Sequence, residues 1–234
     1  MNPGNQETHG IMQSSTVVII GAGGHGQTIA EALFAATRAG HPVRAAGFLD
    51  DTPELRGTTV AGLPVLGPLS HAKDVECDAF IVGIGDNRAR KRIFDELRAA
   101  ALTVHTVIHP TAVIATTAHI GEGTYIGANA LIGAASAIGD DTIINGAGCV
   151  GHHNRIGAHA HLGPGVNAAG HVIIGDGCEI GTGANFLPDA SVGAWSTVMG
   201  GALVAGSFEG GALIGGAPAR LLRRLDTGER SEVS

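Results

Sequence analysis

Aromatic residues are scarce in this 234-residue sequence, at 3% of the chain, whereas 38 residues are glycine. A disordered chain is nevertheless excluded, because 44% of the residues are hydrophobic and disordered chains are poor in Val, Ile and Leu. The length is sufficient for two modest domains. The composition favours a structure with many tight corners, which glycine permits, and with small buried side chains.

Cysteine, basic residues and long apolar runs are also limited. The three cysteines contain no CxxC pair, which indicates reduced thiols in a cytoplasmic protein. Fourteen Lys and Arg against 21 Asp and Glu give a net charge of −7, so a nucleic-acid surface is not expected. No apolar run approaches the ~20 residues of a membrane span, and the N-terminus lacks a secretory signal pattern. We expect a cytoplasmic protein that neither binds nucleic acid nor inserts into a membrane.

The first half of the chain alternates strand and helix signals. An apolar strand at 16–20 leads into the sequence Gly-Ala-Gly-Gly-His-Gly at 21–26 and then into a helix that ends near Arg38. Further elements are expected as strands at 45–49 and 79–84, a hairpin at 58–66 and a helix at 88–100. This order is typical of a short Rossmann-like βαβ domain with a parallel sheet.

A six-residue repeat begins at Ile108. Every sixth residue from there to Val204 is aliphatic or Phe at sixteen of seventeen positions, with Ala168 as the exception. The residue two places earlier is usually small, and glycine often follows. This period excludes an amphipathic helix or a simple strand and predicts a parallel β-helix with 18-residue coils.

Four segments follow from these rhythms. We expect a loose tail over residues 1–14, the Rossmann-like domain over 15–107, the β-helix over 108–206, and a C-terminal cap and tail over 207–234. Within the cap, residues 215–224 predict a turn and a short closing helix that covers the open edge of the β-helix.

Four features in order carry a resemblance to a known family. They are the glycine loop at 21–26, Phe48-Leu49-Asp50-Asp51, the unbroken hexapeptides, and the Gly-x-Pro-Ala turn at 216–219. With them the sequence resembles the left-handed β-helix sugar acyltransferases of the bacterial NeuD/PglD-like family, which acetylate sialic acids or UDP-4-amino-sugars. The resemblance implies a homotrimer with acetyl-CoA between neighbouring β-helices, no metal cofactor, and an N-terminal domain that holds a nucleotide-linked sugar.

The resemblance also implies which residues of the N-terminal domain bind that sugar nucleotide. Backbone amides at a helix start favour phosphate, which suits the glycine loop. The phosphates and sugar are assigned to Gly23, Gly24 and His25, and the nucleoside to Asp50, Asp51, Gly85 and Asn87. The loop also fits the dinucleotide fingerprint, but an NAD-dependent oxidoreductase would leave the β-helix unexplained.

His152 is the candidate general base for acetyl transfer. An imidazole suits this role because it titrates near neutrality. Gly170 lies 18 residues later, one coil beyond His152, where Ala168 thins the wall, and the resemblance places the oxyanion-binding amide there. His153 occupies the position of an acidic partner, which leaves open what orients His152. Cys149 precedes an inward residue, so an acyl-enzyme on its thiol is not favoured.

Asn145, His161 and Pro218 complete the expected acetyl-CoA and acceptor contacts. Asn145 and His161 are 16 residues apart and share one side of the β-helix, whereas His152 lies half a coil from His161. One chain cannot easily bring them together, so we expect an active site shared between two chains.

The predicted function is N-acetylation of a UDP- or GDP-linked 4-amino-4,6-dideoxy sugar by acetyl-CoA, for glycan or O-antigen synthesis. The alternatives are a sugar O-acetyltransferase of the sialic-acid type, a non-catalytic sugar-nucleotide binding protein, and a zinc hydratase of the γ-carbonic-anhydrase kind. The histidines at 152, 153, 159, 161 and 171 suggest the hydratase, but no His-x4-His pair occurs.

Overall fold

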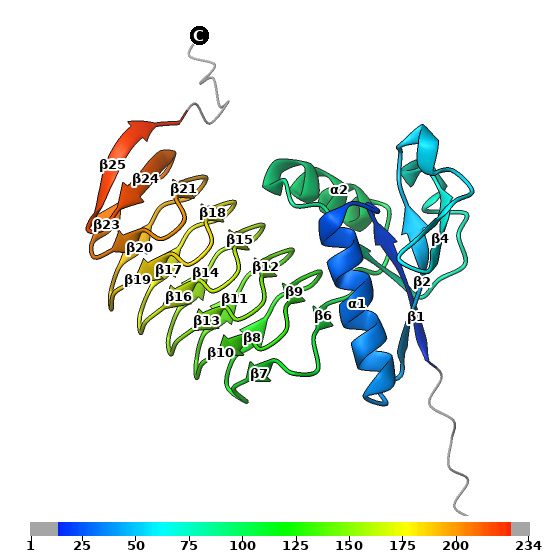
Figure 1. The fold of residues 1–234 in the computed structure, drawn as a ribbon, viewed down its shortest axis with the longest axis horizontal. Helices are drawn as coiled ribbons and strands as arrows, with labels where there is room; N and C mark the ends of the chain where they lie inside the picture. Colours follow the sequence, from blue (N-terminus) through cyan, green and yellow to red (C-terminus); the bar gives the residue numbers. More distant parts are fainter. Residues whose placement is uncertain (1–13, 226–234) are drawn as a thin grey trace, which may run out of the picture.

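The computed structural model describes residues 14–225, so the tail predicted for residues 1–14 lies almost wholly outside the described residues, as does the end of the predicted cap. The N-terminal domain contains a five-stranded sheet in the order β3-β4-β2-β1-β5, with helices packed beside it (Figure 1). All its pairings are parallel except β3 with β4. The elements are β1 (Ser15–Ile20), α1 (Gly24–Arg38), β2 (Val43–Leu49), the 3-10 turn η1 (Pro53–Leu55), β3 (Thr59–Val60), β4 (Leu63–Gly67), η2 (Leu69–His71), β5 (Ala79–Val82) and α2 (Asn87–Ala99). The predicted parallel domain and its hairpin are confirmed.

The glycine loop is shaped by close backbone packing between β1 and α1. Gly21 has a φ of 95°, which L side chains rarely adopt. A Cβ on Gly26 would lie 1.9 Å from the carbonyl oxygen of Gly21, so no larger residue fits at the start of α1. These glycines let the chain turn from strand to helix within a few residues.

The second half of the chain is a parallel β-helix with three flat faces (Figure 1). The first face contains β7 (Val113–Ile114), β10 (Leu131–Ile132), β13 (Cys149–Val150), β16 (Asn167–Ala168), β19 (Asn185–Phe186) and β22 (Leu203–Val204). The second face contains β8 (His119–Ile120), β11 (Ala137–Ile138), β14 (Arg155–Ile156), β17 (Ile173–Ile174), β20 (Ser191–Val192) and β23 (Ser207–Phe208). The third face contains β6 (Val107–Ile108), β9 (Tyr125–Ile126), β12 (Ile143–Ile144), β15 (His161–Leu162), β18 (Glu179–Ile180), β21 (Thr197–Val198), β24 (Ala212–Gly216) and β25 (Ala219–Arg224).

The coils stack with the 18-residue spacing that the sequence predicts. Val150 pairs with Ile132 on one side and with Ala168 on the other, and all three are buried. Ala168, the exception in the repeat, pairs next with the large Phe186. A small residue beside a large one keeps the core filled, which is a sufficient packing reason for the exception.

The predicted closing helix at 215–224 is wrong. The segment forms an antiparallel hairpin in which β25 pairs with β24, and it extends the third face beyond β21. Gly216 has a φ of 95°, and Pro218 lies in the turn, where it cannot donate to a helical hydrogen bond. The unpaired edge of the last coil offers strand partners, which decides the conformation of a segment with good helix formers.

The N-terminal domain packs directly against the first coils of the β-helix (Figure 1). Leu33 of α1 belongs to the same buried cluster as Val107, Tyr125 and Ile143 of the third face. Neither helix within residues 14–225 has the length and apolar character needed to cross a membrane.

Candidate active site

Three histidines meet at the corner between the first and second faces. His152 and His153 follow β13, and His171 follows β16 one coil later. The Nδ1 atoms of His152 and His153 are 3.1 Å apart, and the rings of His153 and His171 stack with centroids 5.0 Å apart. The predicted stacking of His153 on His171 is confirmed, and these exposed residues are called the three-histidine cluster below.

The backbone of the β-helix fixes the positions of this cluster. The His153 N–H donates to the Ala134 carbonyl at 2.8 Å, and the His171 N–H donates to the His152 carbonyl at 3.0 Å. His153 and His171 have φ values of 57° and 59°, a left-handed region in which histidine is more common than most side chains. The corner therefore presents the rings to solvent from a rigid backbone.

Gly170 lies directly beneath the His152 ring, as the 18-residue spacing predicts. A Cβ on Gly170 would be 2.5 Å from Cε1 and 2.7 Å from Nε2 of His152. Within residues 14–225 the Gly170 N–H donates to no protein acceptor, so it is open to a ligand. The arrangement offers a base nitrogen and a backbone donor beside one another.

No carboxylate orients the His152 ring through a hydrogen bond among the residues that the structure describes. Its hydrogen-bond partner there is Nδ1 of His153, so the two imidazoles share one proton. Asn154, the next residue, is buried, and its side-chain oxygen accepts from the Val172 N–H. The neighbour on that side is therefore structural.

A second polar group lies on the third face. The Asn145 amide nitrogen is 3.2 Å from Nε2 of His161, which confirms that these two residues share a side. Nδ1 of His161 is 3.3 Å from a carboxylate oxygen of Glu179, one coil further on. The ring of His161 is therefore held at both nitrogens.

His25 reaches this group from the glycine loop. Its ring centroid is 6.2 Å from that of His161 and 5.3 Å from that of Tyr125. Burial lowers the pKa of His25 to about 3, and the charges of His161 and Arg90 act in the same direction. The ring is neutral at physiological pH, and its Nε2 has no hydrogen-bond partner within residues 14–225.

A pocket of about 770 Å³ opens between the two domains on this side. The loop before α2 contributes Gly85 and Asn87, and the β-helix contributes His161 and Glu179. The predicted nucleotide-binding loop and a predicted acceptor contact therefore line one cavity. Asn87 is buried, however, and its amide donates to the carbonyls of Gly177 and Cys178, so it fixes the loop to the β-helix.

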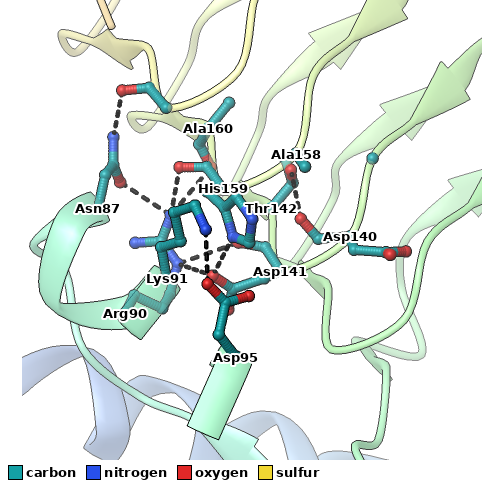
Figure 2. Close-up of polar contacts among 12 residues, drawn as sticks. Asn87, Arg90, Lys91, Asp95, Asp140, Asp141, Thr142, Ala158, His159 and Ala160 are labelled. Atoms are coloured by element: carbon teal, nitrogen blue, oxygen red, sulfur yellow. Dashed lines mark hydrogen bonds and ion pairs between the residues drawn. The ribbon is translucent and has the colours of Figure 1, made fainter. Parts of the chain in front are cut away.

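Arg90 of α2 holds the same loop in place (Figure 2). It is fully buried and donates to the carbonyls of Ile84 and Gly85 in the loop and of Asp141 and His159 in the β-helix. The Asp141 carboxylate is 3.4 Å from Nε of Arg90 and 2.8 Å from Nδ1 of His159. Burial raises the pKa of Asp141, and the hydrogen bond from His159 and the charge of Arg90 oppose that rise.

The acidic residues after β2 have structural partners. Asp50 accepts from the Ala22 N–H at 2.7 Å and from the Thr52 N–H, and these bonds outweigh its burial and lower its pKa. Asp51 accepts from the Leu69 N–H and lines a separate pocket of about 380 Å³. Asp50 therefore shapes the loop that holds Gly23 and Gly24, and Asp51 does not share the cavity of His161.

The two polar groups are separated within one chain. His152 lies at the corner between the first and second faces, and His161 lies on the third face, opposite that corner. Pro218 lies in the exposed turn between β24 and β25, away from both in the coil order. The separation that the sequence predicts is what the fold has.

Several residues of the junction were not anticipated from the sequence. Arg90 was part of a basic run, although it stands in line with Ile93, Phe94 and Leu97 on the buried face of α2. That spacing was the available signal, because a charged residue on an apolar stripe must have a buried partner. Glu179 carried no signal, since its contact with His161 depends on the coil register.

Comparisons with known proteins were made for the whole chain. The model of the PglD N-terminal domain family matches residues 16–97. The crystal structure of PerB from Caulobacter crescentus, in complex with CoA and GDP-perosamine, is 34% identical and covers 89% of this chain and 97% of that one, with a TM-score of 0.81. The chain belongs to the PglD-like family of sugar acyltransferases.

Two further members of the PglD-like family are similar. The acetyltransferase domain of PglB from Neisseria gonorrhoeae FA1090, in complex with acetyl coenzyme A, is 31% identical with a TM-score of 0.81, and covers 89% of this chain and 100% of that domain. The UDP-N-acetylbacillosamine N-acetyltransferase of Bacillus subtilis (strain 168) is 34% identical over 112 residues. That match spans about half of each protein, 46% of this chain and 49% of the relative.

Proposed function

We propose that the protein transfers the acetyl group of acetyl-CoA to the amino group of a nucleotide-linked sugar. The observation that carries the proposal is the stack of His152 on Gly170, a surface imidazole beside an unpartnered backbone N–H. Residues 15–107 would hold the sugar nucleotide and residues 108–206 the thioester. The relatives support this chemistry, since PerB is described with CoA and GDP-perosamine and PglB with acetyl coenzyme A.

The proposed reaction is a direct transfer. The neutral amine attacks the thioester carbonyl, and His152 takes the proton that the nitrogen loses. The Gly170 N–H donates to the oxyanion of the tetrahedral intermediate. When the intermediate collapses, the C–S bond breaks, and the CoA thiolate receives the proton from His152. Atoms and charges balance without a metal or an acyl-enzyme.

His153 takes the orienting role in this proposal. If the Nδ1–H of His152 donates to Nδ1 of His153, then Nε2 of His152 is left free to accept a proton. Nε2 lies on the Gly170 side of the ring, where the thioester would be held. A neutral imidazole can fix this tautomer, although it supplies no negative charge.

The active site is proposed to form between two chains of a homotrimer. His152 of one chain would meet the third-face group of His161 and Asn145 of the next, because one chain keeps them on opposite sides. Mixed trimers of His152→Ala and His161→Ala chains test this directly. Partial recovery of activity supports a shared site, and no recovery in trimers of verified mixed composition contradicts it.

The acceptor is proposed to be a UDP- or GDP-linked 4-amino-4,6-dideoxy sugar. The support is the named chemistry of the relatives, one with GDP-perosamine and one called a UDP-N-acetylbacillosamine N-acetyltransferase. A product of this kind would serve glycan or O-antigen synthesis in the cytoplasm, where the unpaired Cys77, Cys149 and Cys178 stay reduced.

A panel of UDP- and GDP-linked amino-sugars with acetyl-CoA tests the function. CoA release is followed with a thiol reagent, and the product is identified by mass spectrometry. An amide product survives mild alkaline hydroxylamine and an ester does not, so the same assay separates N-acetylation from O-acetylation of the sialic-acid type. No turnover with any amino-sugar or sialic acid would favour a non-catalytic binding protein.

The role of His152 is tested by His152→Asn, which keeps a polar side chain of similar shape. Loss of the general base should lower kcat by about 10²–10⁴-fold. His119 is a matched control, since it is also an exposed histidine of the β-helix but lies on β8. Equal activity of His152→Asn and His119→Asn would refute the assignment of the base.

A further inference from the structure

The three-histidine cluster has a second chemical capacity that acetyl transfer does not use. Within residues 14–225, His152, His153 and His171 are the group of His, Cys, Asp and Glu whose potential ligand atoms lie close enough to hold one metal ion. One nitrogen from each ring lies within 4.8 Å of the others. The remaining histidines near the junction are already engaged, His159 with Asp141 and His161 with Asn145 and Glu179.

The spacing of this cluster fits a tetrahedral ion of the zinc class. Zinc–nitrogen bonds of about 2.0–2.1 Å place neighbouring ligands of a tetrahedral site about 3.3 Å apart. The Nδ1 atoms of His152 and His153 are 3.1 Å apart, so an ion can replace the proton between them with little movement. The His171 ring stacks on His153 at an interplanar angle of 16°, and it must turn about its side-chain bonds to direct a nitrogen at the same point.

The backbone needs no rearrangement for coordination. Coil-to-coil hydrogen bonds of 2.8 Å at His153 and 3.0 Å at His171 fix both residues, and only exposed side chains move. Asp189 occupies the corresponding left-handed corner position one coil beyond His171, where its N–H donates to the Gly170 carbonyl. A carboxylate next to an imidazole ligand strengthens metal binding by supporting the ligand.

We propose that His152, His153 and His171 form an inhibitory site for a divalent transition-metal ion such as zinc. A bound ion occupies the lone pairs of the imidazoles, and His152 needs its lone pair to take the proton from the amine. The ion therefore blocks transfer and is no cofactor. The inhibition rests on the proposed function, whereas the binding does not.

Isothermal titration of the untagged, metal-free protein with zinc chloride tests the binding. We expect one ion per chain at micromolar zinc, and His171→Gln should weaken the affinity at least ~10-fold because a ligand is lost. His119→Gln is the matched control, an exposed histidine outside the cluster, and should bind as the unmodified protein does. Thermal unfolding of each variant shows that it is folded.

The same zinc concentrations are then applied to the acetyl-transfer assay. Each variant is compared with its own zinc-free rate, and the half-inhibitory zinc concentration of His171→Gln should exceed that of His119→Gln by the same factor as the binding constants. Absence of stoichiometric binding, or binding that His171→Gln leaves unchanged, overturns the site. An inactive protein that binds zinc through His171 supports the site and counts only against the proposed function, while an active protein that binds zinc without inhibition overturns the inhibitory role.

Discussion

The replacement of Gly170 by alanine is the sharpest test of the proposed geometry, because it adds one methyl group and removes no functional group. The new Cβ would lie 2.5 Å from Cε1 and 2.7 Å from Nε2 of His152. Carbon atoms in ordinary contact are about 3.5–4.0 Å apart, so the ring must move by about 1 Å. The backbone at Gly170 is not in the left-handed region, so alanine is allowed there.

The expected result is a large loss of rate with little loss of stability. A displacement of about 1 Å in a catalytic group can cost on the order of 10²-fold in rate. The His152 ring is exposed and can swing into solvent, so the free energy of unfolding should fall by less than about 1 kcal/mol. The loss should appear in kcat rather than in the KM for the sugar nucleotide, since the pocket between the domains is untouched.

The assay is steady-state CoA release, accompanied by denaturant unfolding of the same preparations. Gly206→Ala is the matched control, because an added Cβ there meets nothing within 4 Å and the residue is exposed. If Gly170→Ala turns over as fast as Gly206→Ala, then the position of the His152 ring over Gly170 does not matter for the chemistry, and the proposed base and oxyanion donor are both refuted.

Three other predictions concern the junction between the domains. Arg90→Met should lower the free energy of unfolding by about 3–5 kcal/mol, because Asp141 is left as an unpaired buried carboxylate, and adding Asp141→Asn should recover part of it in denaturant unfolding; a loss below about 1 kcal/mol would contradict the buried ion pair. His25 has a folded pKa of about 3 against 6.5 unfolded, so its contribution to stability is complete above pH 6.5 and is lost as the pH falls toward 3. Between pH 7 and pH 5 the unmodified protein should therefore lose about 2 kcal/mol more unfolding free energy than His25→Gln, and equal pH profiles would argue against a buried neutral ring. Glu179→Gln should raise the KM for the sugar nucleotide about 10-fold, since it loosens the ring of His161; an unchanged KM with a lowered kcat would place Glu179 in the chemistry instead.

The sequence was sufficient for those parts of the site that depend on the coil register alone. Because the repeat runs without insertion, adding 18 places Gly170 under His152 and His171 against His153, and both stackings occur. The separation of His152 from His161 follows from the same arithmetic. A periodic fold converts sequence distance into spatial position, which an irregular fold does not.

The parts that could not be predicted depend on contacts between the domains or on competition between structures. The approach of His25 to His161 requires knowledge of how the first domain docks on the third face. The segment after Gly216 has helix-forming residues, yet it pairs as β25 because an open strand edge is nearby. Local preference is weak evidence where a neighbouring edge offers backbone partners.

The regular coil also has an evolutionary consequence. Strands on one face pair at a fixed offset of 18 residues, as Leu131 with Cys149 and Cys149 with Asn167. The docking of the first domain involves coils up to Glu179, so their number relative to that domain is fixed by the loop at Asn87. Beyond them, whole coils can be gained or lost between Thr197 and Leu213 without disturbing either polar group. Lineages of this family can therefore drift in length in steps of one coil while the reaction stays the same.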